Sequence, residues 1–234
     1  MSAAKNNTKN MKPKNKICDG NALSTILAQT QVSTLDDKAF GELVKSGDYL
    51  VRIQLFGATS SLVKQSKFPM AHWGYVADKE NPIDLGGQFD CLVLALRGCA
   101  ARLTSDPVIT VYDVNHPEYA KIRDESEIQD SGCVYGPEFL IYIPAIEQYA
   151  TYHMNNATAR RESPKMKALL GKAATVKAKF IEGKKHSWHG PDVLPCSTPL
   201  NPPEEAKLLE TVKKFVNPEV KVVESAPDTG TRER

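Results

Sequence analysis

The chain has 234 residues, of which 41% are hydrophobic and 25% are charged, an ordinary composition for a globular protein. It therefore excludes collagen-like, mucin-like and wholly disordered chains. Thirty Lys and Arg against 28 Asp and Glu leave a net charge of +2, which by itself argues against a strongly basic nucleic-acid-binding protein. The sequence contains no apolar run of about 18 residues and no apolar signal peptide, so we expect a cytoplasmic protein without a transmembrane helix.

The charge is distributed unevenly along the chain. Residues 1–16 contain five lysines and no acidic residue. Residues 157–189 contain nine basic and two acidic residues, whereas residues 117–150 contain seven acidic and two basic residues. The near-neutral total is therefore an average over segments of opposite sign. A local basic groove for nucleic acid remains compatible with it.

The elements of the first half are predicted as follows. Residues 1–32 have no periodic apolar face and predict a basic flexible tail, and residues 33–47 predict a capped helix. Alternating polarity predicts a strand over 51–55. Short apolar runs predict further strands over 73–76, 89–97 and 108–112. The acidic stretch 114–132 is expected to be irregular or briefly helical.

Two hairpins and two helices are predicted in the second half. Residues 139–143 and 148–154 predict one hairpin, and residues 176–180 and 186–194 predict another around Gly183. Ser163 followed by Pro164 predicts the start of a short helix over 164–170, with Gly171 at its exit. An amphipathic pattern predicts a last helix over 204–216.

The order of these elements favours a mainly β (α+β) fold. Strands and helices do not alternate along the chain, as they would for a parallel sheet. One short helix before a final hairpin is the order of the OB-fold, a five-stranded barrel with a helix between its third and fourth strands. We therefore expect an antiparallel OB-like barrel with helical insertions over residues 33–200. Flexible tails are expected at both ends, with residues 201–234 forming a C-terminal helix and tail.

The five cysteines do not indicate a disulfide framework or a zinc site, because their number is odd and no CxxC pair occurs. Cys91, Cys99 and Cys133 lie in apolar surroundings and are expected to be buried. No Walker A loop, GxSxG elbow, GxGxxG or HExxH motif is present. His186 and His189 form the one close histidine pair. We expect a solvated or stacking role for this pair rather than metal binding. We expect no cofactor, no metal and no catalytic activity.

The basic segment also contains aromatic residues, a combination that suits single-stranded nucleic acid, since cations follow the phosphates and rings stack on the bases. Trp188, His189 and Tyr149 have polar neighbours and are the favoured stacking candidates, whereas Phe180, Tyr152 and Tyr142 are expected in the core. Trp73 is either a core anchor, which we favour, or a second stacking site. Arg160 and Arg161 either reach the nucleic acid or form salt bridges with the acidic stretch 117–130. The predicted groove consists of Arg160, Arg161, Lys165, Lys177, Lys179, Lys184, Lys185, Tyr149, His153 and Trp188.

Three segments, Gly132–Leu140, Thr158–Lys172 and Ser187–Pro191, resemble phage-encoded proteins of about this length. Over roughly residues 49–200 the overall plan resembles bacteriophage single-stranded DNA-binding proteins with an OB-fold. The resemblance implies a protein of the host-cell cytoplasm that protects single strands in phage or plasmid DNA replication and recombination. It also implies replication or recombination proteins as partners. Many such proteins recruit partners through an acidic C-terminal tail, whereas Asp228–Arg234 is not acidic, which puts recruitment by this route in doubt.

Two other functions stay open at this point. A β-barrel with a basic arm also suits a virion structural or assembly protein. An enzyme with an unrecognised site around Cys133, His153, His186 or His189 is the second alternative. No membrane partner is expected, and the sequence leaves the oligomeric state open.

Overall fold

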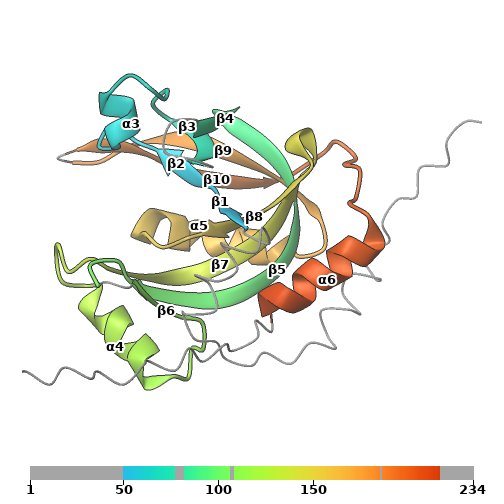
Figure 1. Ribbon diagram of the computed structural model, residues 1–234. Helices are drawn as coiled ribbons and strands as arrows, with labels where there is room; N and C mark the ends of the chain where they lie inside the picture. The colour runs from blue at the N-terminus through green and yellow to red at the C-terminus, as the bar shows by residue number, and fades with distance from the viewer. Residues whose placement is uncertain (1–49, 77–81, 106–107, 185, 217–234) are drawn as a thin grey trace, which may run out of the picture.

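The computed structural model describes residues 50–76, 82–105, 108–184 and 186–216, and it is mainly β, with ten strands and a few helices (Figure 1). This confirms the prediction of a mainly β fold, but not that of a five-stranded barrel. The strands form two open sheets rather than a closed barrel. The predicted helix over 33–47 and both predicted tails lie outside the described residues.

The larger sheet has the strand order β1-β8-β7-β5-β9-β10, and β6 pairs with one end of β5. Every pair is antiparallel except β1–β8. The bounds of its strands are β1 Val51–Arg52, β5 Gln88–Arg102, β6 Ile109–Val111, β7 Cys133–Ile143, β8 Gln148–His153, β9 Ala173–Glu182 and β10 Ser187–Pro195.

Strand β5 is the centre of this sheet because it serves two neighbours in succession. Its first residues pair with β9, its last residues pair with β7, and Leu92 pairs with both. The strand predicted over 89–97 is therefore correct but extends further at both ends. The continuous apolar run from Cys91 to Ala95 suits this position, because both faces of the strand are buried.

Both predicted hairpins are present. Strands β7 and β8 are joined by the short 3₁₀ helix η1 (Pro144–Ile146), and β9 and β10 meet around Gly183. The residues from Tyr149 to His153 are all buried, since each face of β8 has its own apolar cover.

A smaller sheet with the order β2-β3-β4 follows directly after β1 in the chain. Its strands are β2 Gln54–Phe56, β3 His72–Val76 and β4 Pro82–Gly86, and the short helix α3 (Ser61–Lys64) lies between β2 and β3. Trp73 of β3 is fully buried, which confirms the core position favoured for it. It meets the rings of Phe89 and Tyr152 edge to face.

Three longer helices complete the fold: α4 Pro117–Glu125, α5 Ala157–Ala168 and α6 Glu205–Val216. Helix α6 agrees with its prediction within one residue, and α4 lies within the stretch expected to be briefly helical. The predicted start of α5 at Ser163 is wrong. The helix begins seven residues earlier, where Asn156 Oδ1 accepts a hydrogen bond of 2.8 Å from the amide of Ala159.

Pro164 lies inside α5 because its missing N–H is compensated locally. In an unbroken helix this N–H would donate to the carbonyl of Arg160. Instead, the Ser163 hydroxyl donates to that carbonyl at 2.8 Å. The Ser163-Pro164 pair is therefore compatible with the interior of a helix. Gly171 still ends the segment as predicted, with a φ of +74°.

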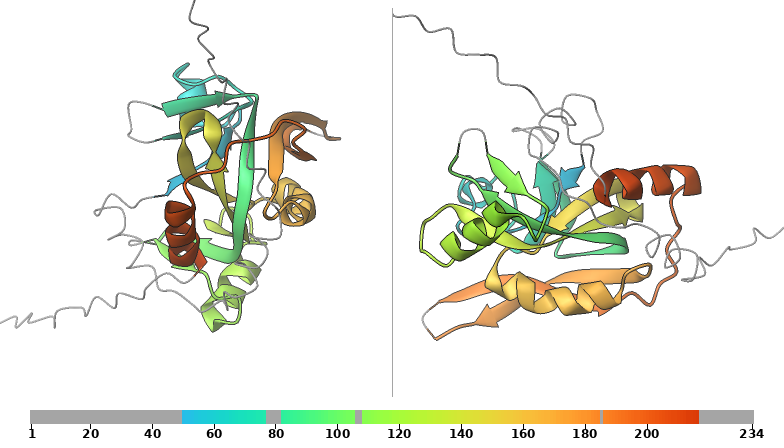
Figure 2. Two further views of the ribbon diagram at one scale, coloured as in Figure 1. Left: turned by 90° about the vertical axis from the view of Figure 1, so that its right-hand side faces the viewer. Right: turned by 90° about the horizontal axis from the view of Figure 1, so that it is seen from below.

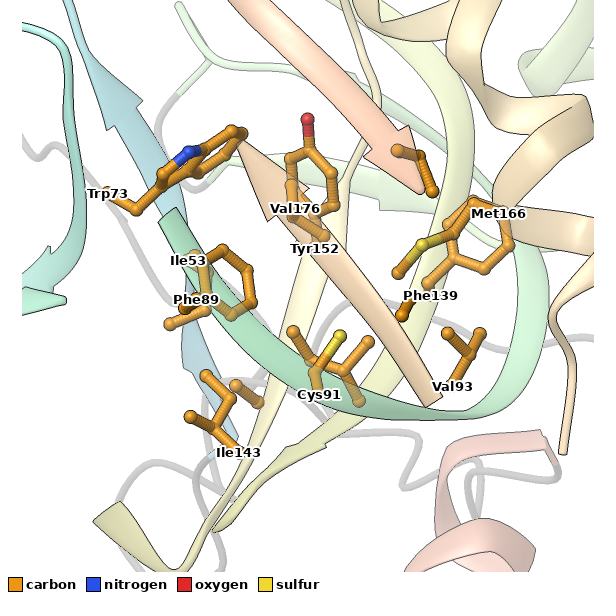
Figure 3. Packing of buried hydrophobic residues seen from close by; sticks show 14 of the residues in the cluster. Ile53, Trp73, Phe89, Cys91, Val93, Phe139, Ile143, Tyr152, Met166 and Val176 are labelled. Atoms are coloured by element: carbon orange, nitrogen blue, oxygen red, sulfur yellow. The ribbon is translucent and has the colours of Figure 1, made fainter. Parts of the chain in front are cut away.

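Two apolar clusters lie on opposite faces of the larger sheet. The first contains Trp73, Phe89, Phe139, Tyr152 and Met166, among others (Figure 3). The second joins β5, β7 and β8 to the apolar side of α6. Helix α6 and the β9–β10 hairpin consequently lie on opposite sides of strands β5 and β7 (Figure 2).

Helix α5 runs beside β10, the last strand of the sheet, as Figure 2 shows. Glu162 Oε2 accepts a hydrogen bond of 3.2 Å from the amide of Val193. Ala159 and Met166 of the helix extend into the first apolar cluster. The helix therefore covers an edge that would otherwise expose unpaired backbone groups.

Candidate nucleic-acid interface

A groove of about 610 Å³ lies between β2 with its following loop, the start of α5 and the outer end of the β9–β10 hairpin. Its lining combines aromatic and amide side chains. The residues that line it include Arg52, Gln54, Met70, Leu103, His153, Asn155, Asn156, Phe180, Trp188 and His189.

Aromatic rings are exposed along the hairpin side of this groove. The exposed fractions of Phe180 and Trp188 are 58% and 42%, and the ring of His189 lies 5.3 Å from that of Phe180. The prediction that Phe180 belongs to the core is wrong, because the hairpin extends past the core. Ala178 is the last residue of β9 that contacts the first apolar cluster. The alternation from Val176 to Phe180 cannot reveal where the cover above a strand ends.

Trp188 is held in one orientation by its neighbours. Its indole N–H donates to Thr158 Oγ1 of α5 at 3.2 Å. A Cβ added at Gly183 would lie 2.5 Å from the indole ring, so the turn of the hairpin accommodates the ring closely. The ring is therefore ordered before any ligand arrives, which lowers the entropic cost of stacking.

The described lining of the groove carries no negative charge. Among the described residues that line it, none is Asp or Glu, and Arg52 is the one Lys or Arg. Further positive charge lies on the same hairpin. Lys177, Lys179 and Lys184 form no ion pair within the part of the chain that the structure describes, and Lys179 pairs across the strands with Gly190, which lines the groove.

The remaining predicted cations are placed less favourably. Lys165 is occupied by Glu162 at 2.7 Å and by Asp192 at 3.5 Å. Arg161 is exposed on α5, and Lys185 lies outside the described residues. Arg160 takes neither of the two roles predicted for it. Its guanidinium donates to the carbonyls of Tyr135 and Asn155 and lies 4.3 Å from the ring centre of Tyr135, so it links α5 to β7.

Tyr149 lies away from the groove, in the cluster beneath α6. Its ring is 5.1 Å from that of Tyr142, and Lys207 of α6 lies over it. Burial raises the pKa of Tyr149 to about 12. Tyr149 is therefore not available as a stacking surface while α6 is in place, a correction to its predicted role.

His153 belongs to a buried group of polar residues on the α6 face of the sheet. Burial lowers the pKa of its imidazole to about 4, against the opposing effect of Glu138. Glu138 is fully buried and lies across the strands from both His153 and Arg97. The imidazole is therefore neutral at pH 7. His153 lines the groove but contributes no positive charge to it.

Glu138 forms the centre of this group. Its Oε2 accepts from Arg97 at 2.7 and 2.8 Å, and its Oε1 accepts from Arg52 at 3.5 Å. Burial raises the pKa of Glu138, but the two guanidinium groups outweigh this effect and leave the pKa below its ordinary value. The sequence places Glu138 in an acidic stretch, and no pattern marks it as the partner of two distant arginines.

Arg97 connects this group to the C-terminal helix. Its guanidinium lies between two rings, 3.6 Å from the centre of Tyr112 and 4.1 Å from that of Phe215. It also donates to the carbonyl of Phe215 at 3.0 Å. The buried carboxylate therefore fixes the last turn of α6 on one side and Arg52, at the groove, on the other.

Comparisons with known proteins add nothing further, since the chain matches no protein-family model, no curated protein and no solved structure. Within the described ranges, no three His, Cys, Asp or Glu side chains cluster in a way that could hold a metal ion. No helix in those ranges is long and apolar enough to cross a membrane.

Proposed function

We propose that this protein binds single-stranded DNA without catalysis, in the groove beside the β9–β10 hairpin. The observation that carries the proposal is the exposure of Phe180 and Trp188 along a groove that no described Asp or Glu lines. Large aromatic side chains are usually buried, so two that remain exposed at one groove point to a ligand. Lys179 and Lys184 of the same hairpin form no ion pair within the described part of the chain and can neutralise phosphates.

The two rings and the lysines supply different parts of the affinity. Each stacked base contributes roughly 1–3 kcal/mol, and stacking tolerates any sequence because every base has a flat face. The lysines add attraction that weakens with salt. A duplex hides the faces of its bases, so this arrangement favours single strands over double strands.

We further propose that five strands and one helix form an OB-type core. Strands β8, β7, β5, β9 and β10 follow one another across the sheet, and α5 lies in sequence between β8 and β9. Counted from β5, the helix falls between the third and fourth of these strands, as in the OB-fold. This order supports the resemblance to bacteriophage single-stranded DNA-binding proteins and, with it, a role in replication or recombination.

Fluorescence anisotropy with labelled single- and double-stranded oligonucleotides over a salt series tests the proposal. We expect preference for the single strand and a steep loss of affinity with salt. Lys179→Ala and Lys184→Ala should each reduce the slope of log affinity against log salt by about 0.7. Glu210→Ala on α6, distant from the hairpin in sequence and on the other side of the sheet, serves as a control variant. Absence of any salt-dependent preference for single strands would refute the proposal.

Intrinsic fluorescence provides a second test, since the chain has two tryptophans and Trp73 is fully buried. We expect single-stranded DNA to quench the emission of Trp188. Trp188→Phe should abolish the quenching while retaining a ring, and Trp188→Ala should also weaken binding about tenfold or more. If Trp188→Ala binds as tightly as the unaltered protein, the groove is not the binding site.

A further inference from the structure

The lining of the groove includes side-chain amides whose hydrogen-bonding groups are unused in the described part of the chain. Gln54 of β2 and Asn155 at the start of α5 both line it. Within the described part of the chain, neither side-chain amide forms a hydrogen bond to the protein. Asn155 takes part through its backbone alone, donating to His153 and accepting from Arg160. Stacking and phosphate contacts do not need these amides.

A side-chain amide is suited to read the edge of a base. It offers a donor and an acceptor side by side, which match the N6 amino group and the N7 nitrogen of adenine. The same edge of guanine presents two acceptors, O6 and N7, so an amide can donate to only one of them and leaves its own acceptor unpaired. The two adjacent donors of guanine, N1–H and N2–H, lie on its Watson–Crick edge, and a carboxylate matches them best. No carboxylate is found among the described residues that line this groove.

We propose that the groove distinguishes bases and prefers adenine to guanine, with Gln54 and Asn155 as the groups that read the base edge. This inference rests on the proposed function, since it assigns a base preference to the same groove. It goes beyond binding by stacking alone, which does not depend on the identity of the base. One of the exposed rings, Phe180 or Trp188, would hold the base by its face while an amide contacts its edge.

The test measures the affinity for oligonucleotides of roughly 12 thymidines whose central bases are replaced by dA or by dG. One bidentate contact predicts about tenfold tighter binding of the dA-containing strand. Gln54→Leu should remove this difference, and Gln54→Glu should shift the preference toward dG, because a carboxylate accepts from two donors. Gln88→Leu is the matched control, since Gln88 is also an exposed strand glutamine but does not line the groove.

Asn155→Ala provides a second variant if substitution at Gln54 disturbs β2, and thermal unfolding identifies any variant that does not fold. Salt-dependent binding with equal affinity for the dA and dG strands would overturn the inference and leave the proposed function standing. Failure of every strand to bind would overturn the proposed function itself. A preference that persists unchanged in both Gln54→Leu and Asn155→Ala would show that these amides do not read the base.

Discussion

The buried carboxylate of Glu138 allows a sharp test of how the sheet, α6 and the groove are held together. Glu138 is fully buried, and the side chain of Arg97 is 6% exposed. Removing the carboxylate leaves the Arg97 guanidinium buried without its counter-charge. Breaking a buried pair in this way costs about 3–5 kcal/mol, so Glu138→Ala should lower the free energy of unfolding by that amount.

The effect should depend on burial rather than on the loss of a salt bridge as such. Arg52 contacts the same carboxylate at 3.5 Å, but its side chain is 38% exposed and can be solvated by water. Arg52→Ala should therefore cost only roughly 1 kcal/mol. Glu210→Ala removes an exposed helix pair with Lys214 and should cost about 0.3–0.5 kcal/mol.

Urea unfolding at pH 7 measures these differences. The double variant Glu138→Leu with Arg97→Met should be more stable than Glu138→Ala, since it removes the isolated charge and restores apolar volume. If Glu138→Ala costs no more than Glu210→Ala, the carboxylate does not hold Arg97 in the folded protein. If the double variant is the least stable, the loss comes from packing and not from an uncompensated charge.

Three further predictions concern pH, helix capping and close packing. The pKa of His153 is about 4 in the folded protein and 6.5 in the unfolded chain, so the unfolded chain takes up the proton first. The free energy of unfolding should therefore fall by about 3 kcal/mol as the pH drops from 6.5 to 4. His153→Leu should flatten this part of the profile of urea unfolding against pH, and an unchanged profile would contradict the lowered pKa of His153. Asn156→Ala should cost about 1 kcal/mol by removing the cap of α5, whereas a larger loss in Ser163→Ala would restore Ser163 as the start of the helix. Gly136→Ala should lower the melting temperature strongly, because the added Cβ would lie 2.2 Å from the Met154 carbonyl and the φ of +157° at this position disfavours a side chain. A melting temperature within experimental error of that of the unaltered protein would show that β7 can move away from the end of β8 at this point.

Local sequence patterns predict the strands and hairpins of this protein because they depend on neighbouring residues. The apolar run in β5, the turn at Gly183 and the amphipathic pattern of α6 are all contained within a few residues. The start of α5 could not be predicted in the same way. Ser163-Pro164 has the sequence of a helix start, and only the bond from Ser163 to the Arg160 carbonyl makes it compatible with a helix interior.

The candidate site was less predictable, because exposure depends on distant segments. Tyr149 has polar neighbours in the sequence, yet α6 covers it from more than fifty residues away. Phe180 follows an apolar alternation, yet no segment in the described part of the chain buries its ring at the end of the hairpin. Arg52 and Gln54 lie in β1 and β2, far in sequence from the basic segment, and reach the groove only through the folding of the sheets.

The central position of β5 has a consequence for the order of folding. Its pairing with β9 joins residues far apart in the chain, as in the hydrogen bond between Asp90 and Thr175 across 85 positions. Closing such a loop is entropically costly, and contacts of this kind slow folding. The β7–β8 and β9–β10 hairpins close over short loops and should form earlier. In pulsed hydrogen exchange, the hairpin amides should therefore gain protection before the first residues of β5, so that the proposed binding hairpin precedes the sheet to which it belongs.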